Sequence, residues 1–169
     1  MSGKNVAFAA GTGMLVFVDL IAHMILKRVA EKGGPDLLAE TQPSLPDDFK
    51  LELYTSFYNE DEAVGLELIK ALENLYQDYV QESLVSSGIG TPDRVAEADT
   101  CPFVHVGRLN SIPKQKAVRW DQDYFRNKFD GFERSGVAKV YICAPPIVQE
   151  FFDRAAYNRV ESKTQFHAL

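Results

Sequence analysis

The sequence has few of the side chains that hold metals or form disulfides. It contains two cysteines and three histidines in 169 residues. Cys101 and Cys143 stand far apart and form no Cys-x-x-Cys pair, and the three histidines are equally scattered. A structural zinc site needs such ligands at short, regular spacings. We therefore expect no metal site and no disulfide framework, and a reducing compartment is the default environment.

Basic clusters are also missing. The net charge is −6, the sequence pI is about 5.1, and no run of lysine or arginine stands out. A nucleic-acid-binding protein normally has a basic face, so this class is disfavoured. Apolar residues make up 46% and charged residues 25%, which is typical of a globular chain. We expect a single domain that spans residues 1–169.

Only one apolar run, from Val6 to Leu26, is long enough to cross a bilayer. Two features oppose a membrane span. Asp19 and His23 lie within its second half, and a charge near the bilayer centre costs about 3 kcal/mol on insertion scales. Two glycines also interrupt the run. We expect no membrane span in this chain, and a location on the cytoplasmic side.

The same run is typical of a strand, a tight turn and a helix. Residues 6–10 are apolar and short enough for a buried strand, Gly11-Thr12-Gly13 allows a turn, and a helix is predicted from Met14 to Glu31. Such a turn directs free N–H groups of the helix towards an anion, usually a phosphate. The longer Gly-x-Gly-x-x-Gly motif is absent because position 16 is valine.

Strand and helix patterns alternate along the rest of the chain. Strands are predicted at residues 49–57, 103–106, 137–143 and 163–168, and helices at residues 63–83, 120–135 and 147–159. This alternation predicts the α/β class: a three-layer, open parallel sheet with helices on both faces, as in Rossmann-like nucleotide-binding domains.

Three unusual stretches follow predicted strands. They are Gly11-Thr12-Gly13, Gly107-Arg108 and Cys143-Ala144-Pro145-Pro146. Ligands of open α/β sheets bind beyond the carboxyl ends of the strands, where strand order reverses. We therefore expect these stretches to form one site.

The three stretches together resemble the nucleotide-binding domain of the ferredoxin–NADP reductase superfamily, which includes cytochrome b5 reductases, ferric reductases and NADPH oxidases. In that family one strand ends in Gly-Gly-Thr-Gly and a later one in Cys-Gly-Pro-Pro. Ala10-Gly11-Thr12-Gly13 and Cys143-Ala144-Pro145-Pro146 are similar, and Gly107-Arg108-Leu109-Asn110 resembles a Gly-Arg-x-Asn stretch of the ferric reductase branch.

The resemblance implies that the chain presents NAD(P)H for hydride transfer to FAD. It places Cys143 beside the nicotinamide as the catalytic residue. It assigns cofactor contacts to Gly11, Thr12, Gly13, Met14, Gly107, Arg108, Ala144 and Pro145. The run Glu60-Asp61-Glu62 follows the second strand, where the family contacts the adenosine ribose, and its charge favours NADH over NADPH. An ordinary acidic helix start explains this run equally well.

The sequence departs from the family at three motif positions. Ala10 and Ala144 stand where the family has glycine, and Val16 stands near the position of a proline. The Arg-x-Tyr-Ser/Thr motif of the family's FAD-binding domain is absent, so we expect FAD to be bound by another domain or chain. The alternative is a degenerate, non-catalytic member that acts as a structural or interaction subunit of a larger assembly.

Overall fold

The computed structural model describes residues 3–31, 46, 48–57, 59, 61, 63–86, 103–109, 120–157, 159 and 164–169. For residues 80–86 and 104–109 it describes the backbone alone. These ranges contain every strand and helix that is discussed below.

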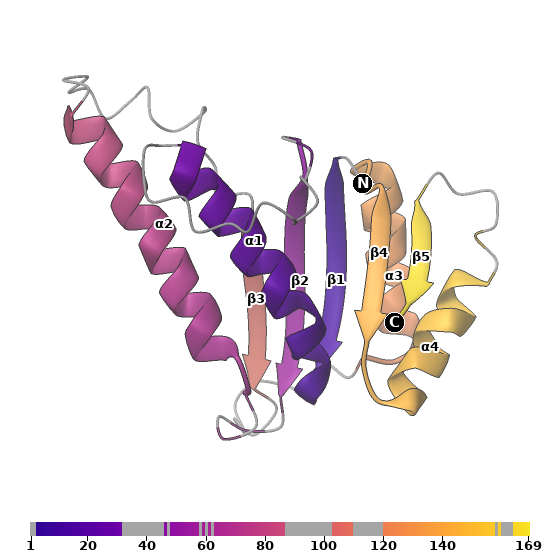
Figure 1. Cartoon of the computed structure of the whole chain (residues 1–169). Coiled ribbons are helices and arrows are strands. Elements are labelled where there is room, and N and C mark those ends of the chain that lie inside the picture. The colour runs from indigo at the N-terminus through magenta and orange to yellow at the C-terminus, as the bar shows by residue number, and fades with distance from the viewer. Residues whose placement is uncertain are drawn as a thin grey trace.

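The centre of the fold is a five-stranded parallel sheet (Figure 1). Its strands are β1 (Lys4–Ala10), β2 (Lys50–Phe57), β3 (Phe103–Leu109), β4 (Lys139–Cys143) and β5 (Gln165–Ala168). Their spatial order is β3-β2-β1-β4-β5, and every neighbouring pair is parallel. β1 is therefore the central strand, with β2 on one side and β4 on the other.

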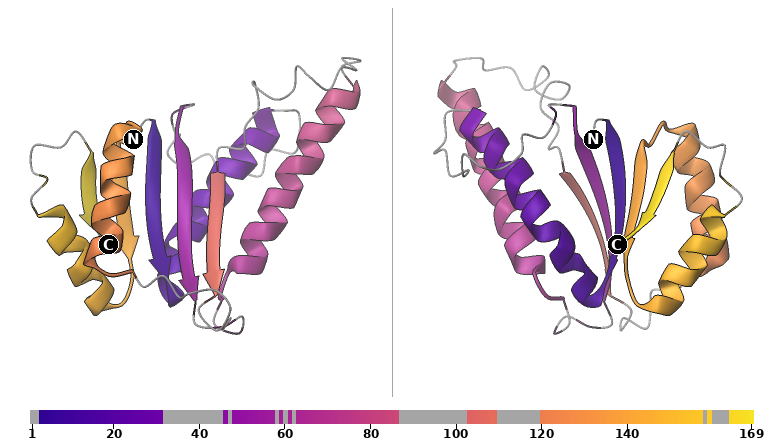
Figure 2. Two further views of the ribbon diagram at one scale, coloured as in Figure 1. Left: turned by 180° about the vertical axis from the view of Figure 1, so that it is seen from behind. Right: turned by 45° about the vertical axis from the view of Figure 1, so that its right-hand side comes forward.

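Helices cover both faces of the sheet. They are the 3-10 helix η1 (Gly11–Met14) and the α-helices α1 (Leu15–Glu31), α2 (Leu66–Ser86), α3 (Gln122–Arg134) and α4 (Pro146–Ala156). Figure 2 shows α1 and α2 on one face and α3 and α4 on the other. The predicted three-layer α/β architecture is confirmed.

The two cores differ in composition because β1 points small residues to one face and large ones to the other. Ala7 and Ala9 are buried under α1, in a mainly aliphatic core. Val6 and Phe8 are buried under α3 and α4, where aromatic rings dominate. The Phe8 and Phe125 ring centroids lie 5.2 Å apart in a T-shaped arrangement, which aromatic rings favour. Burial on both faces explains why β1 reads as a continuous apolar run.

The predicted elements are present, with shifted ends. The helix expected at residues 63–83 spans Leu66–Ser86, the one expected at 120–135 spans Gln122–Arg134, and the one expected at 147–159 spans Pro146–Ala156. The correction that bears on the predicted site concerns β3, which the sequence pattern ends at residue 106. It continues to Leu109, because pairing with β2 extends from Leu51–Phe103 to Phe57–Leu109.

The long apolar run is divided between two layers of the domain. Its first residues belong to β1, and the remainder belongs to η1 and α1, which packs on the sheet. Within the described part of the chain, no helix is both long enough and apolar enough to cross a membrane.

Candidate functional site

A pocket lies where β1 and β4 end. Its volume is about 520 Å³. The residues that line it are Ala10, Gly11, Thr12, Gly13, Val16, Cys143, Ala144 and Pro145. The structure thus brings together the glycine turn and the cysteine–proline stretch, which are separated by most of the sequence.

The position of this pocket follows from the strand order. From β1 the chain crosses to β2 and then to β3 on one side, and then returns to β4 on the other side of β1. Strand order therefore reverses between β1 and β4, and the pocket lies at the carboxyl ends of these two strands. In open parallel sheets this is the usual place for a ligand.

The two glycines of the turn serve different purposes. Gly11 has a φ of +56°, which side chains other than glycine rarely adopt, and a methyl group there would meet nothing within 4 Å. A methyl group on Gly13 would lie 2.1 Å from the carbonyl oxygen of Cys143. Gly11 is therefore needed for the turn, whereas Gly13 is needed because the start of the helix lies directly against the end of β4.

The two helices that begin at the pocket lack a capping side chain at their N-termini. Ala10 precedes η1 and Pro145 precedes α4, and no described side chain caps either end. Neither first turn contains an acidic residue. Helix starts usually have a capping side chain that accepts from the free N–H groups. At α4 the first residue, Pro146, has no N–H, and the N–H groups of Val148 and Gln149 donate to the carbonyl oxygen of Pro145, so α4 offers fewer free donors than most helix starts. The two positive helix ends flank one pocket without an acidic residue in either first turn, which suits an anionic ligand.

The catalytic candidate lies in the wall of the pocket. Cys143 is the last residue of β4, is half-buried, and is a free thiol. Its sulfur would lie 3.2 Å from a methyl group on Gly13, so the thiol is next to the turn. Thr12 is exposed, whereas the side chain of Met14 is fully buried in the core. Met14 can therefore contact a ligand in the pocket only through its backbone.

The third predicted stretch lies further away. Gly107 and Arg108 are inside β3, opposite Thr55 and Ser56 of β2, rather than beyond the strand's end. Two strand spacings, about 10 Å, separate β3 from β1. The side chain of Arg108 lies outside the described residues. The structure therefore unites two of the three stretches and places the third on the same sheet, towards its edge.

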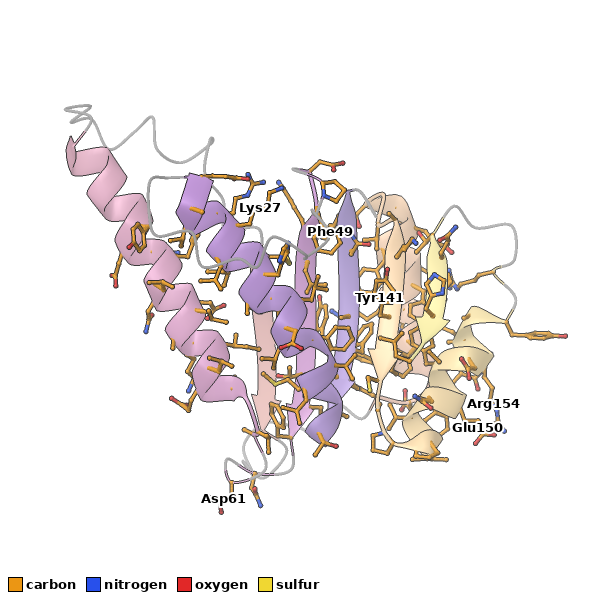
Figure 3. The ribbon with its side chains drawn as sticks, viewed as in Figure 1. Lys27, Phe49, Asp61, Tyr141, Glu150 and Arg154 are labelled. Carbon is orange, nitrogen blue, oxygen red and sulfur yellow. The ribbon has the colours of Figure 1, made fainter. Side chains whose placement is uncertain are left out.

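Of the acidic run, the structure describes only Asp61. It is exposed and lies near the end of the sheet at which the strands terminate (Figure 3). Glu60 and Glu62 lie outside the described residues. This position of Asp61 agrees with a location beside a ligand that extends from the pocket towards β2.

Two lining residues, Ala10 and Val16, were not assigned to the site by the sequence. Ala10 is the last residue of β1, and Val16 is half a turn beyond η1 and 53% exposed. The comparison with the reductase motif had marked both positions, although only as departures from it. Both are positions at which the sequence departs from the reductase motif, and so is Ala144.

A second hollow of about 510 Å³ lies between the end of α4 and the start of β5. Two charged residues, Asp153 and Arg159, line it, and Arg159 already forms ion pairs with Asp130 and, at 2.8 Å, with Glu133. The hollow therefore offers no unpaired charge through Arg159. In the described part of the chain, no group of three or more His, Cys, Asp or Glu side chains could bind a metal ion. The β1–β4 pocket is the better candidate.

No protein-family model matches the chain, and no curated protein matches it. The arguments for a function are therefore the geometry of the pocket and the motifs that line it.

Proposed function

We propose that this chain is the nicotinamide-nucleotide-binding module of a flavin-dependent oxidoreductase. It would present NAD(P)H, with NADH preferred, to FAD bound by another domain or chain. The observation that carries the proposal is the pocket itself. It joins Gly11-Thr12-Gly13 and Cys143-Ala144-Pro145, the two motifs that resemble the reductase superfamily, at the switch point of the sheet.

The residues of the pocket fit a pyridine nucleotide. The turn at residues 11–13 forms one wall of the pocket, and its two glycines expose backbone there. A methyl group at Gly11 would meet no other atom within 4 Å. A pyrophosphate can approach such a backbone closely and accept hydrogen bonds from its N–H groups. The uncapped starts of η1 and α4 add two positive helix ends, which stabilise the same anion.

In this proposal the chain binds and orients, and the cofactors supply the redox chemistry. When bound, the reduced nicotinamide donates a hydride to the flavin. Thr12 and the backbone of η1 hold the phosphates. Ala144 and Pro145 form an apolar wall that excludes water from the ring. Cys143 lies between these two parts and would contact the ring near its reacting carbon.

Titration with NADH and with NADPH, by calorimetry and by thermal unfolding, tests the proposal. A ligand at a concentration of one hundred times its dissociation constant stabilises the folded protein by about 2.7 kcal/mol. We expect this shift with NADH, and a smaller one with the same concentration of NADPH. The absence of binding by either nucleotide would contradict the proposal.

The alternative is a degenerate family member that serves as a structural or interaction subunit. One observation favours it: Ala10, Val16 and Ala144, which replace motif glycines and a proline, all line the pocket. Each side chain occupies space beside a ligand. A folded protein that binds neither nucleotide would support this alternative, so the same titration separates the two functions.

Reconstitution with the flavin-binding partner tests the role of Cys143. Alone, the chain should be colourless and should not oxidise NADH with ferricyanide. With the partner it should oxidise NADH with ferricyanide. We place the module on the cytoplasmic side of the cell. Cys143→Ser should lower turnover more than nucleotide affinity, because in this proposal the thiol would contact the nicotinamide ring rather than the phosphates. Full activity of this variant would remove Cys143 from the catalytic site.

A further inference from the structure

The second hollow, between the end of α4 and the start of β5, is separate from the candidate pocket. Its volume of about 510 Å³ is within the range of small-molecule sites. The two cavities share no described lining residue. They lie at opposite ends of α4, a helix of 11 residues that is therefore about 16 Å long (Figure 1). The proposed function does not use this hollow.

Apolar side chains form part of the wall of this hollow. Phe152 is buried, and Phe166 and Ala156 are half-buried. The ring of Phe166 is held by its neighbours, because its centroid lies 4.5 Å from that of Phe129 and 6.2 Å from that of Phe152. A ligand in the hollow can therefore place an apolar group against a fixed surface and remove it from water.

The positive charge at the hollow already has partners. Arg159 is a lining residue whose side chain is only 16% exposed. Its guanidinium forms ion pairs with Asp130 and, at 2.8 Å, with Glu133. It also donates to the carbonyl oxygen of Arg126 at 3.3 Å and lies over the ring of Phe129. A guanidinium with these partners has little capacity left for an anionic ligand.

The negative charge at the hollow, by contrast, is in excess. Asp153 lines the hollow and is exposed, and none of the hydrogen bonds and ion pairs of the described residues uses its carboxylate. The next residue, Arg154, pairs instead with Glu150. With the two carboxylates that hold Arg159, three carboxylates surround one guanidinium. The hollow therefore favours a ligand with a positive charge.

We propose that the hollow is a second binding site, for a small organic ammonium ion with an apolar ring. The ammonium group would pair with the carboxylate of Asp153, and the ring would lie against Phe166 and Ala156. The side-chain amide of Gln165, another lining residue, offers a further acceptor. A metal ion fits less well, because the described residues contain no group of three His, Cys, Asp or Glu side chains that could hold one.

The first part of the test compares two probes of similar shape and opposite charge. Phenethylammonium combines a ring with a cation, and phenylpropionate combines the same ring with a carboxylate. Backbone amide shifts of the full chain, measured by NMR, locate each probe. We expect phenethylammonium to shift residues 152–157 and 164–166 with a dissociation constant of about 1 mM, which is typical of so small a ligand. No shift of these residues, or equal binding of phenylpropionate, would overturn the proposal.

The second part uses two variants of lining residues and one control on the same helix. Asp153→Asn keeps the shape of the side chain and removes its charge, so phenethylammonium should bind about fivefold more weakly. Ala156→Leu fills the hollow and should weaken binding by about tenfold or more. Glu150→Gln is the matched control, because it removes another carboxylate of α4 that does not line the hollow, and affinity should not change. Thermal unfolding verifies that each variant is folded. Unchanged affinity in either lining variant would overturn the proposal.

A third probe separates a free ligand from a lysine side chain of a partner protein. N-acetyl-lysine methylamide carries the same ammonium group on a chain without a ring. We expect it to bind about fivefold more weakly than phenethylammonium, because it buries no ring against Phe166. Equal or tighter binding would identify a protein side chain as the occupant and overturn the proposal of a small molecule. None of these measurements involves NADH, so their outcome is independent of the proposed function.

Discussion

The N-terminus of α3 has a capping side chain and an acidic first turn, whereas the N-termini of η1 and α4, at the pocket, have neither. At α3, the side chain of Asp121 accepts a hydrogen bond of 2.9 Å from the N–H of Tyr124, and Asp123 adds an acidic residue in the first turn. At η1 and α4, the N-cap residues are Ala10 and Pro145, with no capping side chain among the described residues and no acid. One molecule thus contains both complete and incomplete caps.

The cap on α3 contributes to the stability of the folded chain, whereas the uncapped starts of η1 and α4 are open to a ligand. A capping side chain contributes about 1 kcal/mol to a helix, so its absence at two neighbouring starts costs stability. The two uncapped starts lie at the pocket, where a ligand can reach them. The arrangement is expected if natural selection kept that end open for an anion, as natural proteins often sacrifice stability at functional sites.

The largest expected effect concerns the contact that joins the two walls of the pocket. Gly13→Ala places a methyl group 2.1 Å from the Cys143 carbonyl oxygen, so the turn or β4 must move. We expect the free energy of unfolding to fall by about 3 kcal/mol. Gly131→Ala in α3 is the control, because a methyl group there meets nothing, and it should stabilise by up to about 1 kcal/mol. Urea unfolding measures both; equal effects would contradict the proposed packing.

Thr12→Asp would place an acidic residue in the first turn of η1, as Asp123 is in the first turn of α3. An acid in the first turn stabilises a helix by about 0.3–1 kcal/mol, but the same charge opposes a pyrophosphate. We expect unchanged or higher thermal stability and NADH binding that is weaker by about tenfold, or 1.4 kcal/mol. Calorimetry provides the affinity. If the folded variant binds NADH as tightly as wild type, the phosphate site is in another place.

Removal of the cap on α3 tests whether a cap away from the pocket affects stability alone. Asp121→Ala should lower the free energy of unfolding by about 1 kcal/mol, because the Tyr124 N–H loses its acceptor. NADH affinity should not change, since α3 does not line the pocket. Chemical denaturation and calorimetry on the same preparation measure the two quantities. A weaker NADH affinity would mean that α3 also contributes to the site.

The smallest effect concerns the choice of nucleotide. NADH should bind more tightly than NADPH, because the acidic run repels the 2′-phosphate by about 1 kcal/mol at a screened surface. Asp61→Asn should reduce this preference by about half of that value without affecting NADH. Paired titrations at physiological salt measure the difference. Tighter binding of NADPH by wild type would reverse the assignment.

The sequence predicted the frame of the molecule because strand and helix periodicities are local. The turn at Gly11 and the end of β4 could also be placed, since each follows a short apolar run. Their meeting at one pocket required only the general rule for parallel sheets. The function remains a prediction that rests on motif resemblance and pocket geometry.

Features that depend on partners elsewhere in the chain could not be predicted. Gly107 indicated a strand end, but the ladder with β2 continues past it, because neighbouring strands can override a residue's local preference. The packing role of Gly13 was invisible because its neighbour, Cys143, is remote in sequence. In the sequence, the starts of η1 and α4 showed only a lack of capping residues. Their relevance to a ligand depends on the fold, which places both at one pocket.

The central position of β1 also has a consequence for the order in which the chain folds. β1 is made first, and β2 can pair with it early, but β4 emerges only after most of the chain has been synthesised. Until then one edge of β1 is open, and Val6 and Phe8 lack the aromatic layer that covers them. Such late, distant pairing slows folding and exposes intermediates to aggregation. The pocket, which needs both strands, is complete only when β4 has joined β1.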